Sequence, residues 1–130
     1  MKQYADLDEN GKIEDAALRL KLAQTLMADK AFNLTVRRMA EQAKAGDEVG
    51  HTASIIKYAS AKLNQNKTEL VVEAMGAQGL GWDGDAYSEK ELAAPKAMLR
   101  AKANSIEGGT SEVNLNVVAK RVLGLKEHKG

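Results

Sequence analysis

The sequence contains no cysteine and a single proline, and aromatic residues make up only 4% of its 130 residues. Without cysteine, disulfides are excluded, and a reducing, cytoplasmic setting is expected. No apolar run approaches the roughly 18 residues that would span a bilayer, and the polar stretch 1–10 contains no apolar segment of a signal peptide. The formal net charge of +1 does not favour nucleic acid or an anionic membrane as a partner.

What is present indicates one soluble, helical domain. Hydrophobic residues make up 44% of the chain and charged residues 28%, which is a globular rather than a disordered balance. Alanine, leucine, lysine and glutamate are abundant, and these residues favour helix. The predicted fold class is therefore all-α, an up-down four-helix bundle.

The first predicted helix, over residues 13–45, follows a flexible lead over residues 1–12. It has one apolar stripe at three- and four-residue spacing, formed by Ala16, Leu20, Ala23, Met27, Ala31 and Leu34. A second stripe lies on roughly the opposite side and comprises Leu18, Leu22, Phe32, Val36, Met39 and Ala43. A helix with two apolar sides must be central in its fold or must also face another chain.

Three further helices complete the bundle domain, which we expect over residues 13–125, with a tail over 126–130. A helix over 52–75 is expected to bury Ile56, Ala59, Leu63, Leu70 and Ala74. The third helix begins at Ser88 or at Pro95, since proline suits a first helical turn, and ends near Asn104. The fourth covers residues 111–123 and again has two apolar faces. Either every stripe lies in the core of the bundle, or the chain self-associates; we expect self-association.

The most informative stretch is 105–125, SIEGGTSEVNLNVVAKRVLGL. Two glycines permit close backbone approach and positive φ, and Thr110 or Ser111 can cap a helix that has Glu112 in its first turn. Gly124 is placed as the left-handed residue that ends this helix. The pattern fits an ordinary structural turn, and it also fits a loop whose N–H groups bind a phosphate or another polar ligand.

This stretch resembles the C-terminal signature of the acyl-CoA dehydrogenases, and the resemblance extends from about Ala16 to Leu125. Three upstream segments match the family in order: TASIIK at 52–57, EAMGAQGL at 73–80 and RAKANSI at 100–106. The resemblance implies the helical C-terminal domain of that family only, incomplete at its N-terminal end. The complete enzymes also contain an N-terminal helical domain and a β-barrel.

The resemblance implies a part of an enzyme that uses FAD to desaturate an acyl-CoA thioester between its α- and β-carbons. This chain would supply part of the FAD site and the oligomer interface and would be inactive alone. Its partners would be further copies of itself or the missing domains of such an enzyme. The alternative is a free-standing, non-catalytic helical interaction module derived from the family.

Site residues carry over only where positions match. In the family, the turn after the second long helix meets the flavin dinucleotide of a neighbouring subunit, which implies Glu73, Ala74, Met75, Gly76 and Ala77 here. Many relatives have glutamine at the position of Glu73; a carboxylate near a pyrophosphate is unfavourable unless it points away or contacts sugar hydroxyls. In the signature, Thr110 and Glu112 match flavin-contacting positions, and Thr110 also suits plain helix capping.

The catalytic base of many members is a glutamate directly before the Gly-Thr pair, where this chain has Gly108. Glycine cannot act as a general base. Glu107 stands one residue away and is either a displaced base or a surface acid beside the helix. Some relatives carry the base on an earlier helix that has no counterpart in this chain, and that subtype fits Gly108 better.

Other candidate chemistry is sparse. His51 and His128 lack the spacing of metal ligands and are predicted to be surface residues. Asp83 and Asp85 flank Gly84, which is ordinary turn composition but also a possible acid pair. Trp82 either packs on the bundle or borders an acyl pocket.

Overall fold

The computed structural model describes residues 3–47 and 49–126. Four α-helices follow one another: α1 (Ala16–Lys44), α2 (Thr52–Met75), α3 (Glu89–Lys102) and α4 (Ser111–Val117). Two short 3₁₀ segments, η1 (Gly76–Leu80) and η2 (Ala103–Ser105), and a π-helical turn, η3 (Val118–Val122), complete the helical structure. The predicted all-α fold with four helices is confirmed. Within the described ranges, no helix is long and apolar enough to cross a membrane.

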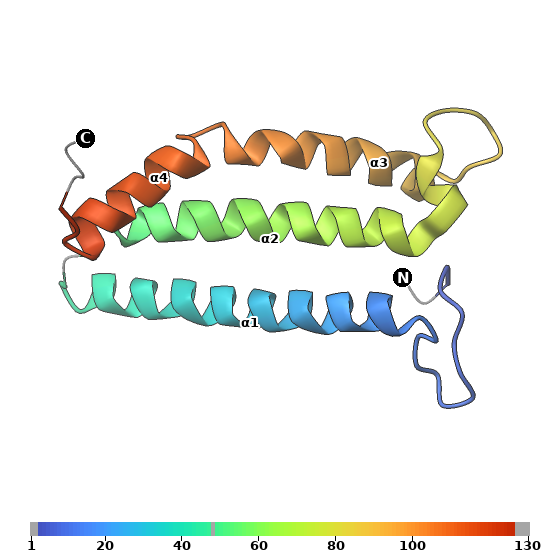
Figure 1. Ribbon diagram of the computed structural model, residues 1–130, viewed down its shortest axis with the longest axis horizontal. Coiled ribbons are helices and arrows are strands. Elements are labelled where there is room, and N and C mark those ends of the chain that lie inside the picture. Colours follow the sequence, from blue (N-terminus) through green and yellow to red (C-terminus); the bar gives the residue numbers. More distant parts are fainter. Residues whose placement is uncertain (1–2, 48, 127–130) are drawn as a thin grey trace.

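Helix α2 is the central element of the fold (Figure 1). Helix α1 runs antiparallel along one side of α2, while α3 and then α4 run antiparallel along its other side. The contacts agree with this picture, since α1 packs mainly on α2, and α3, α4 and η1 pack on α2 as well. Each helix other than α2 therefore has one packed side and one open side.

Helix α1 begins at Ala16, three residues later than predicted. The Asp15 carboxylate caps the helix by accepting hydrogen bonds from the backbone N–H groups of Ala17 at 2.8 Å and Leu18 at 3.0 Å. Ile13, predicted as the first helical residue, instead pairs with Leu7 in an isolated antiparallel bridge and is buried. The core contact of Ile13 thus holds the lead against the helices before α1 starts.

The two apolar stripes of α1 have different environments. The second stripe faces α2: Leu18 is buried, and Leu22, Phe32 and Met39 are half-buried. The first stripe is open, with 58%, 72% and 52% of Leu20, Met27 and Leu34 exposed. The interpretation that α1 is central, and that every stripe lies in the core, is therefore wrong.

Helix α2 spans its predicted range and buries Leu63, Leu70 and Ala74 as predicted, while Ile56 and Ala59 are half-buried. Its polar middle connects it to both neighbours. The Gln65 side-chain amide donates to the carbonyl of Ala101 at the end of α3, at 3.2 Å. Lys67 forms an ion pair with Asp29 of α1.

The start of α3 agrees with one of its two predicted positions, and the end of α4 differs in detail from the prediction. Helix α3 starts after Ser88, which forms a reciprocal capping box with Glu91, so that Pro95 lies buried in the helix interior rather than in its first turn. The α-helical part of α4 stops at Val117, and the predicted helix continues to Val122 as a π-helical turn. Gly124 follows with φ +64°, as predicted for the residue that ends this helix.

The hydrophobic core is thin for a chain of this size. Every buried hydrophobic side chain retains at least 2% exposure: Ile13, Leu18, Ala61, Leu63, Leu70, Ala74, Met75 and Ala101. A compact monomer of 14.0 kDa exposes about 6,700 Å², whereas this chain exposes 9256 Å². The excess of roughly 2,600 Å² by the same scaling shows that the helices form an open arrangement rather than a compact globule.

Candidate functional site

Two glycine-containing turns carry the predicted site residues. The first turn is residues 73–77, where α2 ends and η1 begins. The signature turn is residues 105–112, which leads from η2 into α4. Both turns contain glycines with positive φ, a backbone conformation that other residues rarely adopt.

In the first turn, the backbone at Gly76 is open to solvent. Gly76 has φ +55°, and no other part of the chain lies within 4 Å of the point where a Cβ would stand, so its backbone is open. Ala77 is exposed as well, whereas Ala74 and Met75 are buried against the neighbouring helices. A ligand at this turn would therefore contact the backbone at Gly76 and Ala77. The buried side chains of Ala74 and Met75 would pack beneath that backbone.

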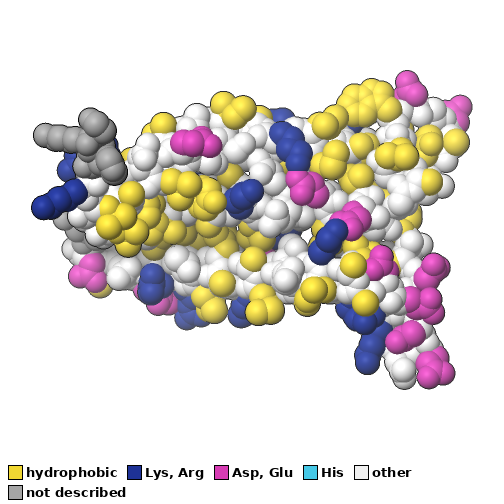
Figure 2. All heavy atoms as spheres, viewed as in Figure 1, with side chains coloured by type: hydrophobic (Ala, Val, Ile, Leu, Met, Phe, Trp, Pro, Cys, Tyr) yellow, Lys and Arg dark blue, Asp and Glu magenta, His cyan; other side chains and the backbone are white. Residues whose placement is uncertain are grey.

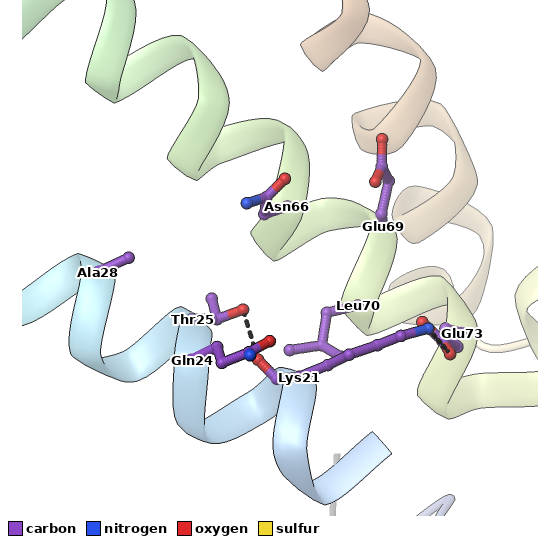
Figure 3. Close-up of a pocket in the computed structure, with 8 residues that line it drawn as sticks. All are labelled: Lys21, Gln24, Thr25, Ala28, Asn66, Glu69, Leu70 and Glu73. Carbon is purple, nitrogen blue, oxygen red and sulfur yellow. Dashed lines mark hydrogen bonds and ion pairs between the residues drawn. The ribbon is translucent and has the colours of Figure 1, made fainter. Parts of the chain in front are cut away.

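The Glu73 side chain is engaged by a lysine of α1. Lys21 Nζ lies 2.5 Å from Glu73 Oε1, and Figure 3 shows Lys21 reaching across from α1 to this carboxylate on α2. The pairing places a positive charge against the carboxylate and turns Glu73 toward α1.

A groove between α1 and α2 leads up to the first turn. It has a volume of about 240 Å³ and is lined by Lys21, Gln24, Thr25, Ala28, Asn66, Glu69, Leu70 and Glu73 (Figure 3). Glu69 forms its ion pair with Lys102 of α3, away from Lys21. A more apolar groove of about 350 Å³ shares Ala28 and Asn66 with it and continues between the helices past Phe32 to Ile55.

The signature turn is built around Asn114. Gly108 and Gly109 have φ +64° and +92°, and Thr110 caps α4 by accepting a hydrogen bond from the Val113 N–H at 3.2 Å. The buried Asn114 side-chain amide donates to the carbonyls of Gly109 at 3.0 Å and Thr110 at 2.9 Å. Glu112 is exposed in the first turn of α4. The capping role of Thr110 leaves its hydroxyl proton available to a ligand.

Glu107 is held by three hydrogen bonds. Arg100 donates to both of its carboxylate oxygens, at 2.8 and 3.3 Å, and the Asn104 side-chain amide donates at 2.6 Å. The hydrogen bonds from Arg100 and then Asn104, with the charges of Arg100 and Lys57, lower the pKa of Glu107 from its ordinary value of 4.5. A carboxylate so occupied has reduced basicity, and the arrangement ties the signature turn to α3.

Gly108 itself packs beside α2. A Cβ at Gly108 would lie 3.2 Å from Lys57 Cε, and Lys57 Nζ donates to the backbone carbonyl of Asn104 at 2.6 Å. Lys57 therefore fixes the start of the signature turn to the N-terminal half of α2. The position where many relatives have their base offers no proton-accepting side chain in this chain.

Substituting Glu107 tests this anchoring role through pH. Because the pKa of Glu107 is lowered in the folded state, the stabilisation is present above pH 4.5 and is lost as pH falls through the lowered value. Glu107→Gln is therefore expected to reduce the free energy of unfolding at pH 7, and this deficit should shrink as the pH is lowered below 4.5. Urea unfolding over a series of pH values measures this. Glu112→Gln is the control, and a Glu107→Gln deficit that does not change with pH would contradict the electrostatic explanation.

The two turns do not converge within one chain. Lys57, beside the signature turn, and Gly76 are separated by 19 helix positions along α2, or roughly 28 Å at 1.5 Å per residue. The predicted residues Glu73–Ala77 and Thr110–Glu112 thus form two separate clusters. A single ligand molecule of ordinary size could contact both clusters only if they came from different chains.

The other candidate residues stand apart from these turns. His51 is exposed, as predicted, and His128 lies outside the described residues. Asp83 and Asp85 lie in an exposed turn, and the described ranges contain no cluster of metal-ligating side chains. Trp82 is 55% exposed, and Lys96 Nζ, from the middle of α3, lies 5.4 Å from its ring centre.

Sequence reasoning missed the residues that hold the turns in place. Lys21, Lys57 and Arg100 each anchor a predicted site residue or its immediate neighbour. No sequence pattern links them to their partners, because two of these contacts join different helices. Only Arg100 and Glu107, seven residues apart, lie close enough in sequence to suggest a pair.

The comparisons with known proteins that give a match all lead to the same family. Residues 2–123 match the family described as acyl-CoA dehydrogenase, C-terminal domain. The chain is 29% identical over 111 residues to acyl-CoA dehydrogenase FadE34 of Mycobacterium tuberculosis, covering 85% of this chain and 14% of that protein. It is 25% identical over 121 residues to acyl-CoA dehydrogenase IpdE1 of Mycolicibacterium smegmatis, covering 92% of this chain and 29% of that protein. No solved structure matches the chain significantly.

Proposed function

Because this chain belongs to the acyl-CoA dehydrogenase family, we propose that it serves as the C-terminal domain, or a fragment of it, of a flavin-dependent acyl-CoA dehydrogenase. In the complete enzyme it supplies part of the FAD site and of the oligomer interface. The observation that carries the proposal is the family match over residues 2–123. Two turns whose glycines have positive φ, at the positions that the resemblance implies for flavin contact, support it.

The exposed groups at both turns suit a flavin dinucleotide. At the first turn, Gly76 and Ala77 offer open backbone, and Lys21 neutralises the nearby Glu73 carboxylate. At the signature turn, Thr110 offers a hydroxyl and Glu112 an exposed carboxylate, which suit the polar groups of the ring system and the sugar hydroxyls. Since the turns are roughly 28 Å apart, one flavin takes the first turn from one subunit and the signature turn from another.

The residues of this chain hold the signature turn and the flavin in place, and they do not transfer protons. In the complete enzyme, residues 73–77 together with Thr110 and Glu112 would hold the flavin, which would supply a hydride acceptor for oxidation of the acyl-CoA between its α- and β-carbons. The α-proton goes to a base that lies outside the signature position, because Gly108 stands there and Glu107 is occupied by Arg100 and Asn104. Arg100, Asn104 and Lys57 hold the signature turn in the shape that presents Thr110.

The chain alone is expected to be inactive, because it spans 14% and 29% of the length of the two relatives and brings only one half of each flavin contact. The test mixes the purified chain with FAD and straight-chain acyl-CoA thioesters of several lengths, and follows reduction of an artificial electron-accepting dye. We expect no turnover and no flavin retained after gel filtration. Dye reduction above the rate of a protein-free blank would refute the proposal.

A free-standing interaction module is the second candidate, and Gly108 favours it because the signature lacks its base. The two candidates differ in what the chain binds. The domain of a dehydrogenase acquires flavin when the remaining domains are supplied, whereas a module binds its partner without flavin. The excess exposed area of the isolated chain supports assembly with a partner in both cases.

A further inference from the structure

We propose that Lys21 of α1 is a further flavin-binding residue, whose ammonium contacts the diphosphate of the flavin dinucleotide at the first turn. This rests on the proposed function and deepens it, because it adds a cation to a turn where the resemblance implies only residues 73–77. Lys21 does more than neutralise Glu73: it binds the ligand itself, while Glu73 holds its ammonium in place.

The ligand brings negative charge that the first turn does not offset. A flavin dinucleotide carries a diphosphate, whereas residues 73–77 contain one carboxylate, Glu73, and no basic side chain. The open backbone at Gly76 and the exposed Ala77 allow a phosphate to approach closely, but a neutral backbone does not balance its charge. A cation from another element is therefore needed at this turn.

Lys21 is the cation that the fold places there. Its Nζ lies 2.5 Å from Glu73 Oε1, and Gly76 follows Glu73 by one helical turn, roughly 4.5 Å along the helix axis. Among the described residues that line the groove leading to the first turn, Lys21 is the one basic side chain. In Figure 3 its side chain extends from α1 toward the C-terminal end of α2, where the first turn begins.

Packing holds the backbone of Lys21 beside the end of α2. One buried cluster joins α1 to α2 here and comprises Ile13, Leu18, Leu70 and Ala74, with Leu22 packed against it. Leu18 and Leu22 flank Lys21 in α1, and Ala74 directly follows Glu73 in α2. The core therefore fixes the distance between the lysine and the first turn, so that the contact does not depend on a flexible side chain alone.

The Lys21 ammonium can serve Glu73 and a ligand at the same time. An ammonium has three N–H donors, and one of them is used by the hydrogen bond to Glu73 Oε1. The side chains of Lys21 and Glu73 are 53% and 44% exposed, so an incoming phosphate reaches the ammonium without separating the helices. Because the carboxylate already restrains the long lysine stem, less rotamer freedom is lost on binding.

The surrounding surface makes this cation more important. Figure 2 shows acidic side chains gathered over the lead, at the end of the molecule where α2 ends. Glu69, the other carboxylate that lines the groove, is paired with Lys102 of α3. Lys21 therefore carries the attraction of this groove for an anion.

Neutralising Glu73 distinguishes a ligand contact from a purely structural ion pair. If Lys21 only neutralised Glu73, it would affect flavin binding only while that carboxylate is present. If Lys21 contacts the diphosphate, it affects flavin binding in a chain that carries Glu73→Gln as well. Glu73→Gln removes the charge but keeps an oxygen that accepts from the ammonium.

The test measures the dissociation constant of FAD for the assembly of this chain with the polypeptide that supplies the remaining dehydrogenase domains, by quenching of flavin fluorescence. In the Glu73→Gln background, Lys21→Gln is expected to raise this constant about tenfold at low ionic strength, as for a lost hydrogen bond to a charged group. The effect should shrink at about 0.5 M salt, because the exposed charge is screened. An unchanged constant in this background would overturn the proposal.

Lys30→Gln is the matched control. It removes the same charge from an exposed position further along α1 and should leave FAD binding unchanged. Equal weakening by Lys30→Gln and Lys21→Gln would indicate a general effect of net charge and would count against a contact at Lys21. Helical circular dichroism should be the same for all these variants, because an exposed ion pair contributes little to stability.

The chain alone gives a second measurement that does not depend on assembly. ADP carries the same diphosphate as FAD, and its binding is followed by the amide NMR shifts of the chain at millimolar ADP. Saturable shifts at Gly76 and Ala77 are expected, and Lys21→Gln should weaken them. The proposal is overturned if the parent chain shows no such shifts, or if Lys21→Gln leaves them unchanged.

Coenzyme A also contains a diphosphate, so the affinity of the assembly for an acyl-CoA is measured beside that for FAD. Lys21→Gln should leave acyl-CoA binding unchanged; weaker acyl-CoA binding with unchanged FAD binding would assign Lys21 to the substrate and overturn the proposal. An assembly that takes up no FAD refutes the proposed function, and the ADP titration then decides the role of Lys21. An assembly that binds FAD equally with and without Lys21→Gln leaves the proposed function standing and refutes the contact.

Discussion

Leu70→Ala is expected to lower the free energy of unfolding by about 2 to 3 kcal/mol. Leu70 is 5% exposed and packs in one cluster with Ile13, Leu18 and Ala74, where the lead, α1 and α2 meet. Since, among the described residues, this cluster is what holds α1 and the lead by buried side chains, the loss affects both. Small domains have a total stability of only about 5–15 kcal/mol, and a thin core implies the lower end of that range.

Urea unfolding followed by circular dichroism measures the effect of Leu70→Ala. Leu99→Ala on α3 removes the same atoms from a site that is 53% exposed and should change stability by less than about 0.5 kcal/mol. Equal losses in the two variants would show that the contact between α1 and α2 is not the main source of stability.

Asn114→Asp is expected to be the second strongly destabilising change, with a loss of about 2 kcal/mol for an uncompensated buried polar contact. The Asn114 amide donates to the carbonyls of Gly109 and Thr110, and aspartate keeps its shape but presents acceptors to acceptors. Asn114→Ala removes the donor without adding repulsion, so it should cost less than Asn114→Asp.

The order of these two variants separates hydrogen bonding from packing. If Asn114 served only to fill space, Asn114→Asp would be nearly neutral and Asn114→Ala the worse of the two. Asn116→Ala, an exposed position on the same helix, is the control and should leave the urea midpoint unchanged. Both Asn114 variants also loosen the turn that presents Thr110, so amide hydrogen exchange at Thr110–Val113 should accelerate.

The helices were predictable because their signals are local. Helix α2 has its predicted ends, since Gly76 stops it, and Ser88 marks the start of α3 through its capping box with Glu91. Pro95 misled because proline costs a backbone hydrogen bond in the interior of a helix but none in its first turn, and the sequence does not reveal that Pro95 is buried in the interior of α3.

Which apolar stripe faces the core was not predictable. Both stripes of α1 have helical spacing and similar composition, and the choice depends on which side meets α2. The polar contacts decide part of it: Asp29 and Lys21 stand beside the second stripe and pair with Lys67 and Glu73 of α2. These pairs link residues 38 and 52 positions apart, which a single sequence does not connect.

The two glycine turns were predictable from the sequence, whereas the distance between them was not. The glycine turns at Gly76 and Gly108 follow from local sequence, and both have the positive φ that glycine permits. Their separation along α2 follows only from the fold, because α4 packs beside the N-terminal half of α2 while the first turn lies at its C-terminal end. The assignment of Thr110, Glu112 and residues 73–77 to flavin contacts stays a prediction.

The central claim is that this chain is one part of a flavin site that other parts complete. The most direct measurement is the visible absorption spectrum of the purified chain with FAD, after gel filtration, before and after mixing with the polypeptide that supplies the remaining dehydrogenase domains. We predict a colourless chain alone and a yellow assembly, with flavin content reduced when the chain carries Thr110→Ala. Stoichiometric flavin on the chain alone, or a stable assembly without flavin, would contradict the claim.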